Sequence, residues 1–323
     1  MSRILTNLAL LALAAPLMAA QAVELPGPVV DTAWLAAHLD EVQVLEVRSN
    51  FASFAREPAF ETDAKTGKKT LSAVGGHLPG AHLIDFKNVR GERQAGENKL
   101  KFMLPERAEF QSRLRAAGVQ DGLPIVLVPV GQEVGDVDEA LRLFWSLRVY
   151  GAASLAVLDG GAAGWIGEGR PVSTAAAPAQ TGNWTASPEH NELLADSETV
   201  AAAASHGVQL VDGRPQPQYY GLNKSPAVAS FGHIDGARNF APELLTRDGN
   251  GALRFLPARA YEALMRTTGI DPKADSITYC NTGHLASGPW FVMHEILGNP
   301  STRLYDGSLS RWTQEKRPLV AVQ

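Results

Sequence analysis

Residues 276–297 read SITYCNTGHLASGPWFVMHEIL. The first four residues form a short β-rich run, and from Ala286 onward apolar residues recur at helical spacing as far as Leu297. A strand that turns directly into a helix is the repeating unit of an α/β fold, in which helices cover both faces of a mainly parallel sheet. Cys280, the only cysteine of the chain, lies at the turn between the two elements.

The chain contains this pattern twice. The matching segments are Glu46–Arg48 with Asp212–Arg214, Gly76–Ala81 with Gly232–Ala237, Leu104–Pro105 with Leu256–Pro257, and Asp159, Trp165 and Pro171 with Asp306, Trp312 and Pro318. The last three pairs share one offset of 147 residues. Such an ordered series indicates an internal repeat and therefore two domains of one fold. We expect the first domain at 23–172 and the second at 191–323, with a linker rich in Ala, Ser, Thr and Pro at 173–190.

The expected elements alternate along each copy. Strands are predicted at 42–47, 125–130 and 154–158, and again at 208–211, 276–279 and 302–305. Helices are predicted at 105–117, 138–148, 257–268 and 286–297. The strand segments are nearly continuous apolar runs, which is typical of parallel sheets buried on both faces. The fold class is therefore α/β, with two tandem domains that each have helices on both faces of the sheet.

The N-terminal residues indicate where the protein is located, and the net charge indicates which partners it can have. Residues 1–22 combine an early Arg3, an apolar stretch at 8–15 and small residues near Ala22, which is typical of a cleaved signal peptide. The sequence thus predicts a periplasmic or secreted protein with no membrane attachment after cleavage. The net charge is −5 at pH 7 without a cluster of Lys or Arg, which argues against nucleic acid as a partner.

Cys280 is the first candidate for chemistry. A single thiol in an exported protein cannot form an internal disulfide and is expected to be reactive or intermolecular. Its position at the carboxyl end of a strand is where α/β sheets bind ligands, and amides at the start of the next helix would lower its pKa. Gly283 permits the tight turn that folds amides around the sulfur. The alternative is a small buried hydrophobic residue at a strand end.

The Cys280–Ala286 loop resembles the active-site loop of the rhodanese family. The segments Val211–Arg214, Gly232–Ala237 and Tyr305–Ser308 with Trp312 are also similar to that family, so that the resemblance covers nearly the whole mature chain. It implies a tandem of α/β domains with catalysis in the second. The first copy has Val128–Gly131 where the second has Tyr279–Thr282, so it lacks the sulfur atom.

The resemblance also implies a mechanism. In it, Cys280 takes sulfur from a small donor as a persulfide and gives it to a thiophilic acceptor such as cyanide or a thiol. No metal and no organic cofactor is required. The implied substrate-binding residues are Asn281, Thr282, Gly283, His284, Leu285, Ala286 and Arg214, and the implied supporting residues are Asp212 and Asp306.

Some of these residues have alternative roles. Asp212 and Arg214 could contact substrate, but a structural ion pair that braces a loop is favoured. His77 and His233 occur in both copies, which favours a structural role in a turn over catalysis or metal binding. Trp165 and Trp312 are expected in the cores for the same reason.

The donor is the most open part of the prediction. Thiosulfate-using members of the family commonly have basic residues in this loop, whereas Asn281 and Thr282 are neutral, as in mercaptopyruvate sulfurtransferases. Gln218 stands where both kinds usually have an arginine, and His284 either supplies part of the missing charge or is a solvated bystander. Thiosulfate is the predicted donor, with 3-mercaptopyruvate as the alternative and a noncatalytic sulfur carrier or partner-binding tandem as the second alternative.

Two further details of the loop bear on activity. Leu285 occupies a position that is often polar in the family, which removes one contact to the sulfur. Ala286 argues against a cysteine phosphatase, because that chemistry needs an arginine six residues after the cysteine to bind phosphate.

Overall fold

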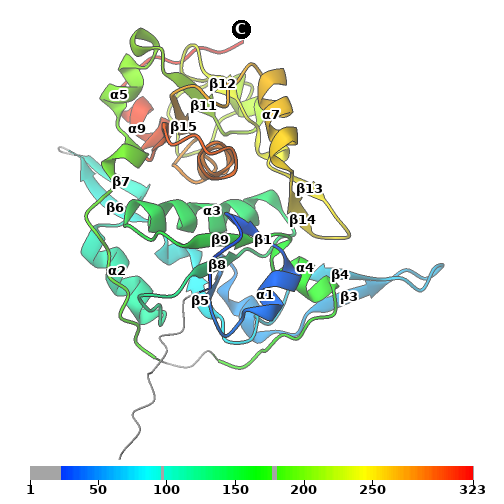
Figure 1. The fold of residues 1–323 in the computed structure, drawn as a ribbon. Coiled ribbons are helices and arrows are strands. Elements are labelled where there is room, and N and C mark those ends of the chain that lie inside the picture. Colours follow the sequence, from blue (N-terminus) through cyan, green and yellow to red (C-terminus); the bar gives the residue numbers. More distant parts are fainter. Residues whose placement is uncertain (1–22, 96–97, 177–179, 323) are drawn as a thin grey trace, which may run out of the picture.

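Two parallel sheets form the framework of the protein (Figure 1). The computed structural model describes residues 23–95, 98–176 and 180–322, and the signal peptide predicted at 1–22 lies outside them. Within this part of the chain, the strand order is β1-β9-β8-β2-β5 in the first sheet and β10-β16-β15-β11-β12 in the second. All neighbouring strands in both sheets are parallel. The predicted α/β fold is confirmed.

Each sheet is built from one half of the chain. The first contains β1 (Val29–Val30), β2 (Gln43–Arg48), β5 (His82–Asp85), β8 (Ile125–Val128) and β9 (Leu155–Leu158). The second contains β10 (Leu194–Ala195), β11 (Gln209–Asp212), β12 (Arg238–Asn239), β15 (Ser276–Tyr279) and β16 (Thr302–Tyr305). Each expected strand is present within two residues of its predicted bounds, because every residue of central strands such as β8 and β15 is buried.

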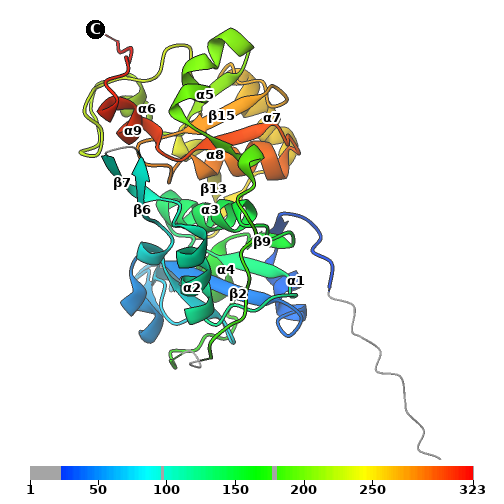
Figure 2. The same cartoon turned by 90° about the vertical axis from the view of Figure 1, so that its left-hand side faces the viewer.

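Helices cover both faces of each sheet (Figure 2). In the first half they are α1 (Thr32–Ala37), α2 (Arg107–Ala116), α3 (Val134–Val149) and α4 (Gly161–Gly167). In the second half they are α5 (Ser197–Ala202), α6 (Gln216–Tyr219), α7 (Ala258–Thr267), α8 (Ser287–Phe291) and α9 (Ser308–Gln314).

Two predicted helix boundaries were wrong. Helix α3 begins four residues before the predicted position 138, because Glu133 and Asp136 form a capping box that satisfies its first amides. The helix predicted at 286–297 is interrupted: α8 ends at Phe291 and a π-helical turn follows at Val292–Ile296.

The two halves share one hydrophobic core. Helices α3 and α8 pack against each other between the sheets, with the Phe144 ring centroid 5.0 Å from that of Phe291 and 6.4 Å from that of Trp290. The largest cluster of buried apolar residues includes side chains from both halves, Cys280 among them. Trp165 and Trp312 lie in two separate clusters on the outer faces of the sheets. The loop that begins at Cys280 is therefore packed against the first half.

Hairpins from each half reach across to the other. The hairpin of β6 (Gly91–Ala95) and β7 (Asn98–Met103) leads to the amide of Leu104, which donates to Asp306 Oδ2 at 2.7 Å. The hairpin of β13 (Thr246–Asp248) and β14 (Leu253–Phe255) ends at Phe255, whose amide donates to Asp159 Oδ1 at 2.8 Å. A third hairpin, β3 (Ala59–Thr62) with β4 (Lys69–Ala73), projects from the first half (Figure 1). The Asp-Gly loops that follow β9 and β16, at Asp159-Gly160 and Asp306-Gly307, are thus each covered by the opposite half.

The repeated histidines lie at equivalent positions in the two halves, where each pairs with a residue near the end of its half. His77 pairs with Ser173 and His233 pairs with Val320 in isolated antiparallel bridges. In the predicted linker, the Trp184 side chain is buried against Phe110 at 5.8 Å between centroids.

Across residues 23–95, 98–176 and 180–322, no group of three or more His, Cys, Asp or Glu could hold a metal ion, and no helix is long and apolar enough to cross a membrane.

Candidate active site

Cys280 lies at the carboxyl end of β15, the central strand of the second sheet. Its side chain is buried, with 1% of the residue exposed. The loop backbone is bonded to the start of α9: the Leu309 amide donates to the Cys280 carbonyl at 3.1 Å and the Ser310 amide donates to the Asn281 carbonyl at 2.9 Å. These bonds fix the loop at the edge where α/β sheets bind ligands.

Backbone amides surround the sulfur of Cys280. The N–H groups of Thr282 and Ala286 donate to it. Ser308 Oγ holds the loop from the other side, since it accepts from the amides of Cys280 at 3.0 Å and Gly283 at 3.1 Å and donates to the Tyr305 carbonyl at 2.8 Å. Ser308 adopts a left-handed backbone conformation, with φ of 46°, that is uncommon for a residue with a side chain. The loop thus offers two amides to an anionic sulfur.

The resting thiol has a raised pKa, and the sequence-based expectation of a lowered one was wrong. Burial is the main cause, and the carboxyl groups of Asp212 and Asp138 add to it. The amides of Thr282 and Ala286 act in the opposite direction without compensating for the loss of solvent. At neutral pH, Cys280 is therefore mostly the protonated thiol.

Arg142 of α3 connects the first half to the Cys280–Ala286 loop. Its side chain is fully buried, and Nη1 lies 2.9 Å from the Gly283 carbonyl and 2.6 Å from Asp306 Oδ1. Gly283 has φ of 74°, and a Cβ atom there would lie 2.6 Å from Asp306 Oδ1 and 2.8 Å from Arg142 Nη1. This position therefore requires glycine, and Asp306 supports the loop by pairing with a cation from the other half.

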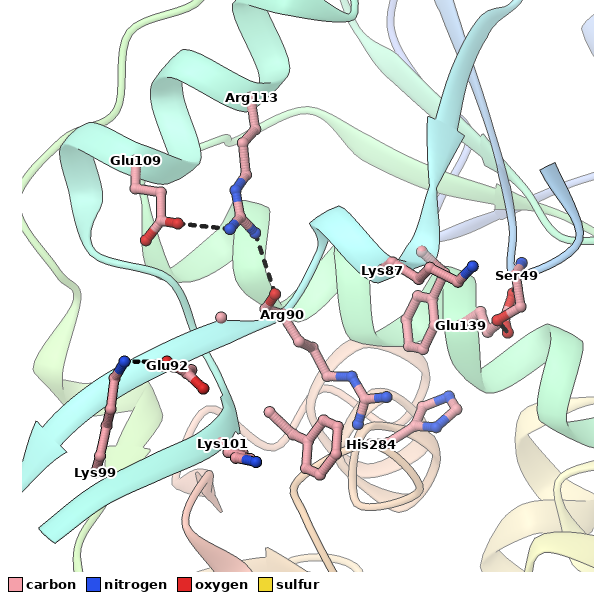
Figure 3. A pocket seen from close by; sticks show the side chains of 13 residues that line it. Ser49, Lys87, Arg90, Glu92, Lys99, Lys101, Glu109, Arg113, Glu139 and His284 are labelled. Carbon is pink, nitrogen blue, oxygen red and sulfur yellow. Dashed lines mark hydrogen bonds and ion pairs between the residues drawn. The ribbon is translucent and has the colours of Figure 1, made fainter.

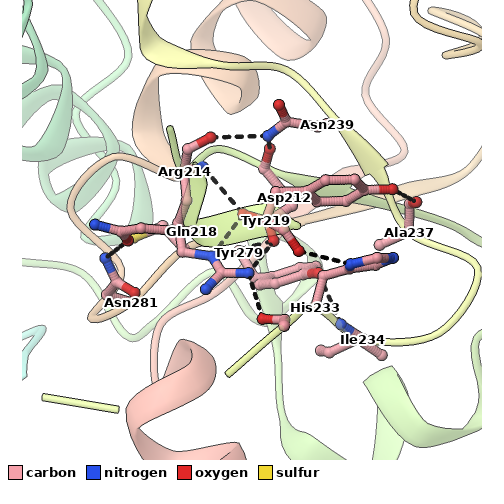
Figure 4. A network of polar contacts seen from close by, with 12 residues as sticks. Asp212, Arg214, Gln218, Tyr219, His233, Ile234, Ala237, Asn239, Tyr279 and Asn281 are labelled. Atoms are coloured by element: carbon pink, nitrogen blue, oxygen red, sulfur yellow. Dashed lines mark hydrogen bonds and ion pairs between the residues drawn. The ribbon is translucent and has the colours of Figure 1, made fainter. Parts of the chain in front are cut away.

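Asp212 and Arg214 form a buried pair behind the loop (Figure 4). Arg214 Nη2 lies 2.6 Å from Asp212 Oδ2 and 2.8 Å from the Gly232 carbonyl, so the guanidinium is held at the strand end. Glu46 and Arg48 form the equivalent pair in the first half, which has no thiol. This duplicated geometry corresponds to bracing, and Arg214 does not line the cavity described below.

The remaining loop side chains have separate surroundings. Asn281 Nδ2 donates to Gln218 Oε1 at 2.8 Å, so Gln218 binds the loop although it carries no charge. Leu285 is half-buried and packs against the shared core. Ala286 is buried and contributes its amide to the sulfur.

A cavity of about 900 Å³ opens between the two halves (Figure 3). It is lined by Ser49, Phe86, Lys87, Arg90, Gly91, Glu92, Lys99, Lys101, Phe102, Glu109, Arg113 and Glu139 of the first half and by His284 of the second. The His284 ring centroid lies 4.8 Å from that of Phe86. Burial, together with the charges of Arg90 and Arg142, lowers the pKa of His284 to about 3. His284 is thus neutral and does not supply the positive charge considered from sequence.

Sequence reasoning assigned no site role to three residues around the loop, although one of them, Ser308, ends the family-like segment Tyr305–Ser308. Ser308 had a usable signal, since the first copy has Gly161 at the equivalent place in the repeat. Arg142 and Arg90 had none, because they reach the loop from the opposite half; Arg90 Nη1 lies 3.4 Å from Thr282 Oγ1, 192 positions away in sequence.

Known proteins match this chain over most of its length. The Rhodanese-like domain family matches residues 195–315, which contain Cys280. The probable 3-mercaptopyruvate sulfurtransferase of Pseudomonas aeruginosa is 30% identical over 89% of this chain and 95% of its own length. The thiosulfate sulfurtransferase of Cricetulus griseus is 28% identical over 76% of this chain and 80% of its own length.

Solved structures show the same fold. The Escherichia coli 3-mercaptopyruvate sulfurtransferase SseA matches with a TM-score of 0.68 and 23% identity, over 87% of this chain and 98% of its own. An anaerobic ergothioneine biosynthesis enzyme from Chlorobium limicola matches with a TM-score of 0.72 and 20% identity, over 92% of this chain and 71% of its own. With relatives that span nearly its full length and a shared tandem fold, the chain belongs to the rhodanese family and is a sulfurtransferase of that type.

Proposed function

We propose that the protein transfers sulfur from thiosulfate to a thiophilic acceptor, cyanide or a thiol, through a persulfide on Cys280. The observation that carries this proposal is the position of the Cys280 sulfur against the amides of Thr282 and Ala286. Amides that point at a sulfur stabilise negative charge on it without a proton transfer. The loop is also anchored by Ser308 and Arg142, so the amides keep this position when charge develops.

The chemistry consists of two displacements. The Cys280 thiolate attacks the outer sulfur of thiosulfate, a new S–S bond forms to Cys280, and the old S–S bond breaks with its electron pair leaving on sulfite. Cyanide then attacks the outer persulfide sulfur, thiocyanate leaves, and the thiolate is restored. The amides of Thr282 and Ala286 stabilise the anionic sulfur in both steps.

The alternative donor, 3-mercaptopyruvate, is favoured by a different observation. Asn281 and Thr282 are neutral, and the Asn281 side chain is bonded to the neutral Gln218, so the loop itself presents no cation to a dianionic donor. With 3-mercaptopyruvate, attack on the thiol sulfur breaks a C–S bond and releases the enolate of pyruvate, which takes up a proton. The persulfide is the same in both cases.

Sulfur loading tests the proposal directly. The protein without residues 1–22 is incubated with thiosulfate or 3-mercaptopyruvate, and intact mass is measured before and after cyanide. We expect the mass of one sulfur atom to be gained on Cys280 and removed by cyanide, and kcat/KM for the two donors to identify the preferred one. The matched Cys280→Ser variant should fold, gain no sulfur and show no turnover. Absence of a cyanide-removable adduct with both donors contradicts the proposal.

We further propose that residues 1–22 direct export and that the enzyme acts in the periplasm or outside the cell. Their charged start, apolar stretch and small residues support this. Cell fractionation and N-terminal sequencing of the protein produced from its full sequence test it. Recovery of uncleaved protein from the cytoplasm contradicts it.

A further inference from the structure

The cavity between the halves contains more cations than its carboxylates neutralise. Lys99 is paired with Glu92 and Arg113 is paired with Glu109. The remaining acid, Glu139, accepts hydrogen bonds from the amide and hydroxyl of Ser49. In the described part of the chain, Arg90, Lys87 and Lys101 have no carboxylate within ion-pair distance, and of these three only Arg90 is removed in part from solvent.

Arg90 is held between two aromatic rings. Its guanidinium carbon lies 4.8 Å from the Phe86 ring centroid and 4.9 Å from that of Phe102. Both rings line the cavity; Phe86 is buried, whereas Phe102 is 44% exposed. Phe102 has φ of 65°, a left-handed conformation that costs about 1–2 kcal/mol for a residue with a side chain. Phe102 is the extra residue where the pairing of β6 with β7 shifts register, between the pairs Gly91–Met103 and Glu92–Lys101, so the bulge accounts for this conformation and places the ring beside Arg90.

The edge of the Arg90 guanidinium faces the catalytic loop. Nη1 lies 3.4 Å from Thr282 Oγ1, next to the amide that binds the Cys280 sulfur. Figure 3 shows the Arg90 guanidinium beside the His284 ring among the residues that line the cavity. The Arg113 guanidinium donates to the Arg90 carbonyl at 3.1 Å and thereby fixes the backbone that carries Arg90. The cation is therefore placed before any ligand arrives.

Arg90 would gain free energy from an anion. Burial, and to a smaller extent the neighbouring charge of Arg142, lowers the pKa of Arg90 to about 10, while the more distant charges of Cys280, Asp306 and Glu139 act in the opposite direction. The group remains a cation at neutral pH but has lost part of its hydration without a paired carboxylate. An incoming anion compensates such a loss.

We propose that Arg90, a residue of the first half, binds the anionic end of the sulfur donor while Cys280 attacks the donor sulfur. The inference rests on the proposed function and specifies how its substrate is recognised. The anionic end is a sulfonate in thiosulfate and a carboxylate in 3-mercaptopyruvate, and both suit the planar fork of a guanidinium. The first half then contributes a substrate-binding cation that the loop of the second half lacks.

The test compares two donors that have an anionic far end, thiosulfate and 3-mercaptopyruvate, with one whose far end is uncharged. Methanethiosulfonate carries the same transferable outer sulfur as thiosulfate, but a methyl group replaces the anionic oxygen. For Arg90→Gln, we expect kcat/KM to fall about 10- to 100-fold for the recognised anionic donor, the size of one charge-assisted hydrogen bond, mainly through KM. With methanethiosulfonate, the fall should be less than about threefold. Thiosulfate and 3-mercaptopyruvate are run side by side, so the donor with the larger loss identifies the anion.

Lys99→Gln is the matched control, since it removes one positive charge from the same cavity at a residue already paired with Glu92. It should change kcat/KM by less than about twofold, because exposed pairs contribute little. Arg90→Lys retains the charge without the planar fork, and its kcat/KM for the anionic donor should lie between those of the wild type and Arg90→Gln. If Arg90→Gln does not fold, Arg90→Lys carries the test. Equal losses on all three donors, or equal losses in Arg90→Gln and Lys99→Gln, overturn the proposal. Failure of every donor to load wild-type Cys280 instead refutes the proposed function.

Discussion

The carboxyl ends of β8 and β15 have the same backbone arrangement and different chemistry. Pro129 follows β8 where Cys280 follows β15. In the first half, the amides of Ala162 and Ala163 donate to the carbonyls of Pro129 and Val130, each at 2.9 Å. In the second half, Leu309 and Ser310 make the equivalent bonds to Cys280 and Asn281. The backbone scaffold has thus been kept in both halves of the repeat, and only the second half has a thiol in it.

The helix that follows each strand accounts for part of the difference. At the start of α3, Glu133 and Asp136 form a capping box, so the chain's own carboxylates occupy the first amides. At the start of α8 no side chain caps the helix, and the amides of Thr282 and Ala286 are directed at the Cys280 sulfur. An anion site at a strand end therefore requires amides that the local sequence leaves unoccupied.

The Asp-Gly loops of the two halves differ in how they are held. Asp306 is paired with the fully buried Arg142 of the first half at 2.6 Å. Asp159 is paired with Arg254 of the second half at 3.5 Å, and both of these side chains are partly exposed. The two halves exchange equivalent contacts, but the contact beside the thiol is buried and the other is not.

The largest expected effect concerns these two ion pairs. Arg142→Ala leaves Asp306 buried without its cation and should lower the free energy of unfolding by about 3–5 kcal/mol. Arg254→Ala removes a partly exposed partner and should cost about 0–1 kcal/mol. Urea unfolding of both variants beside the wild type measures the two losses. In the Arg142→Ala background, Asp306→Asn should recover part of the loss, and equal losses in the two single variants contradict the comparison.

A smaller effect is expected from giving the second half the residue of the first. Gly161 has φ of 56° and Ser308 has φ of 46°, so glycine fits the backbone at position 308. Ser308→Gly removes the acceptor of two amides, each worth about 1 kcal/mol, and should slow sulfur loading roughly 30-fold. Single-turnover loading followed by mass spectrometry measures the rate. Ser308→Ala should slow loading equally while keeping the left-handed strain, and an unchanged rate in both variants would show that the hydroxyl does not hold the loop.

The sequence could predict features that leave a local pattern and not those that depend on contacts between distant residues. Central strands were located within two residues because their apolar runs are continuous, and Cys280 was found because it is the only thiol at a predicted strand end. The start of α3 was missed because its cap consists of two acids, which also occur on solvated helix faces. Arg90 and Arg142 could not be predicted, since contacts across 192 and 141 positions leave no local pattern.

The smallest effect concerns the proton on Cys280. Because burial raises the pKa of this thiol, the thiolate fraction at neutral pH is small and grows about tenfold with each pH unit below that pKa. Single-turnover loading should therefore speed up about tenfold from pH 7 to pH 8. A rate that is flat over this range would indicate a thiol that is already ionised.

A substitution of Asp138 in α3 tests how the first half affects the pKa of Cys280. Its buried carboxyl accepts from the Gly288 amide, Oδ1 has no hydrogen-bond partner among the described residues, and burial raises its pKa well above the ordinary value. A carboxyl with a raised pKa stabilises the fold below its unfolded pKa of about 4, and this stability is lost as pH rises through the folded pKa. Asp138→Asn should remove this loss, so the variant gains stability relative to the wild type as pH rises above about 4. Since the Asp138 charge also raises the pKa of Cys280, the variant should load sulfur faster at pH 7, by less than about threefold. Slower loading in Asp138→Asn would instead assign the carboxyl a role in holding the start of α8.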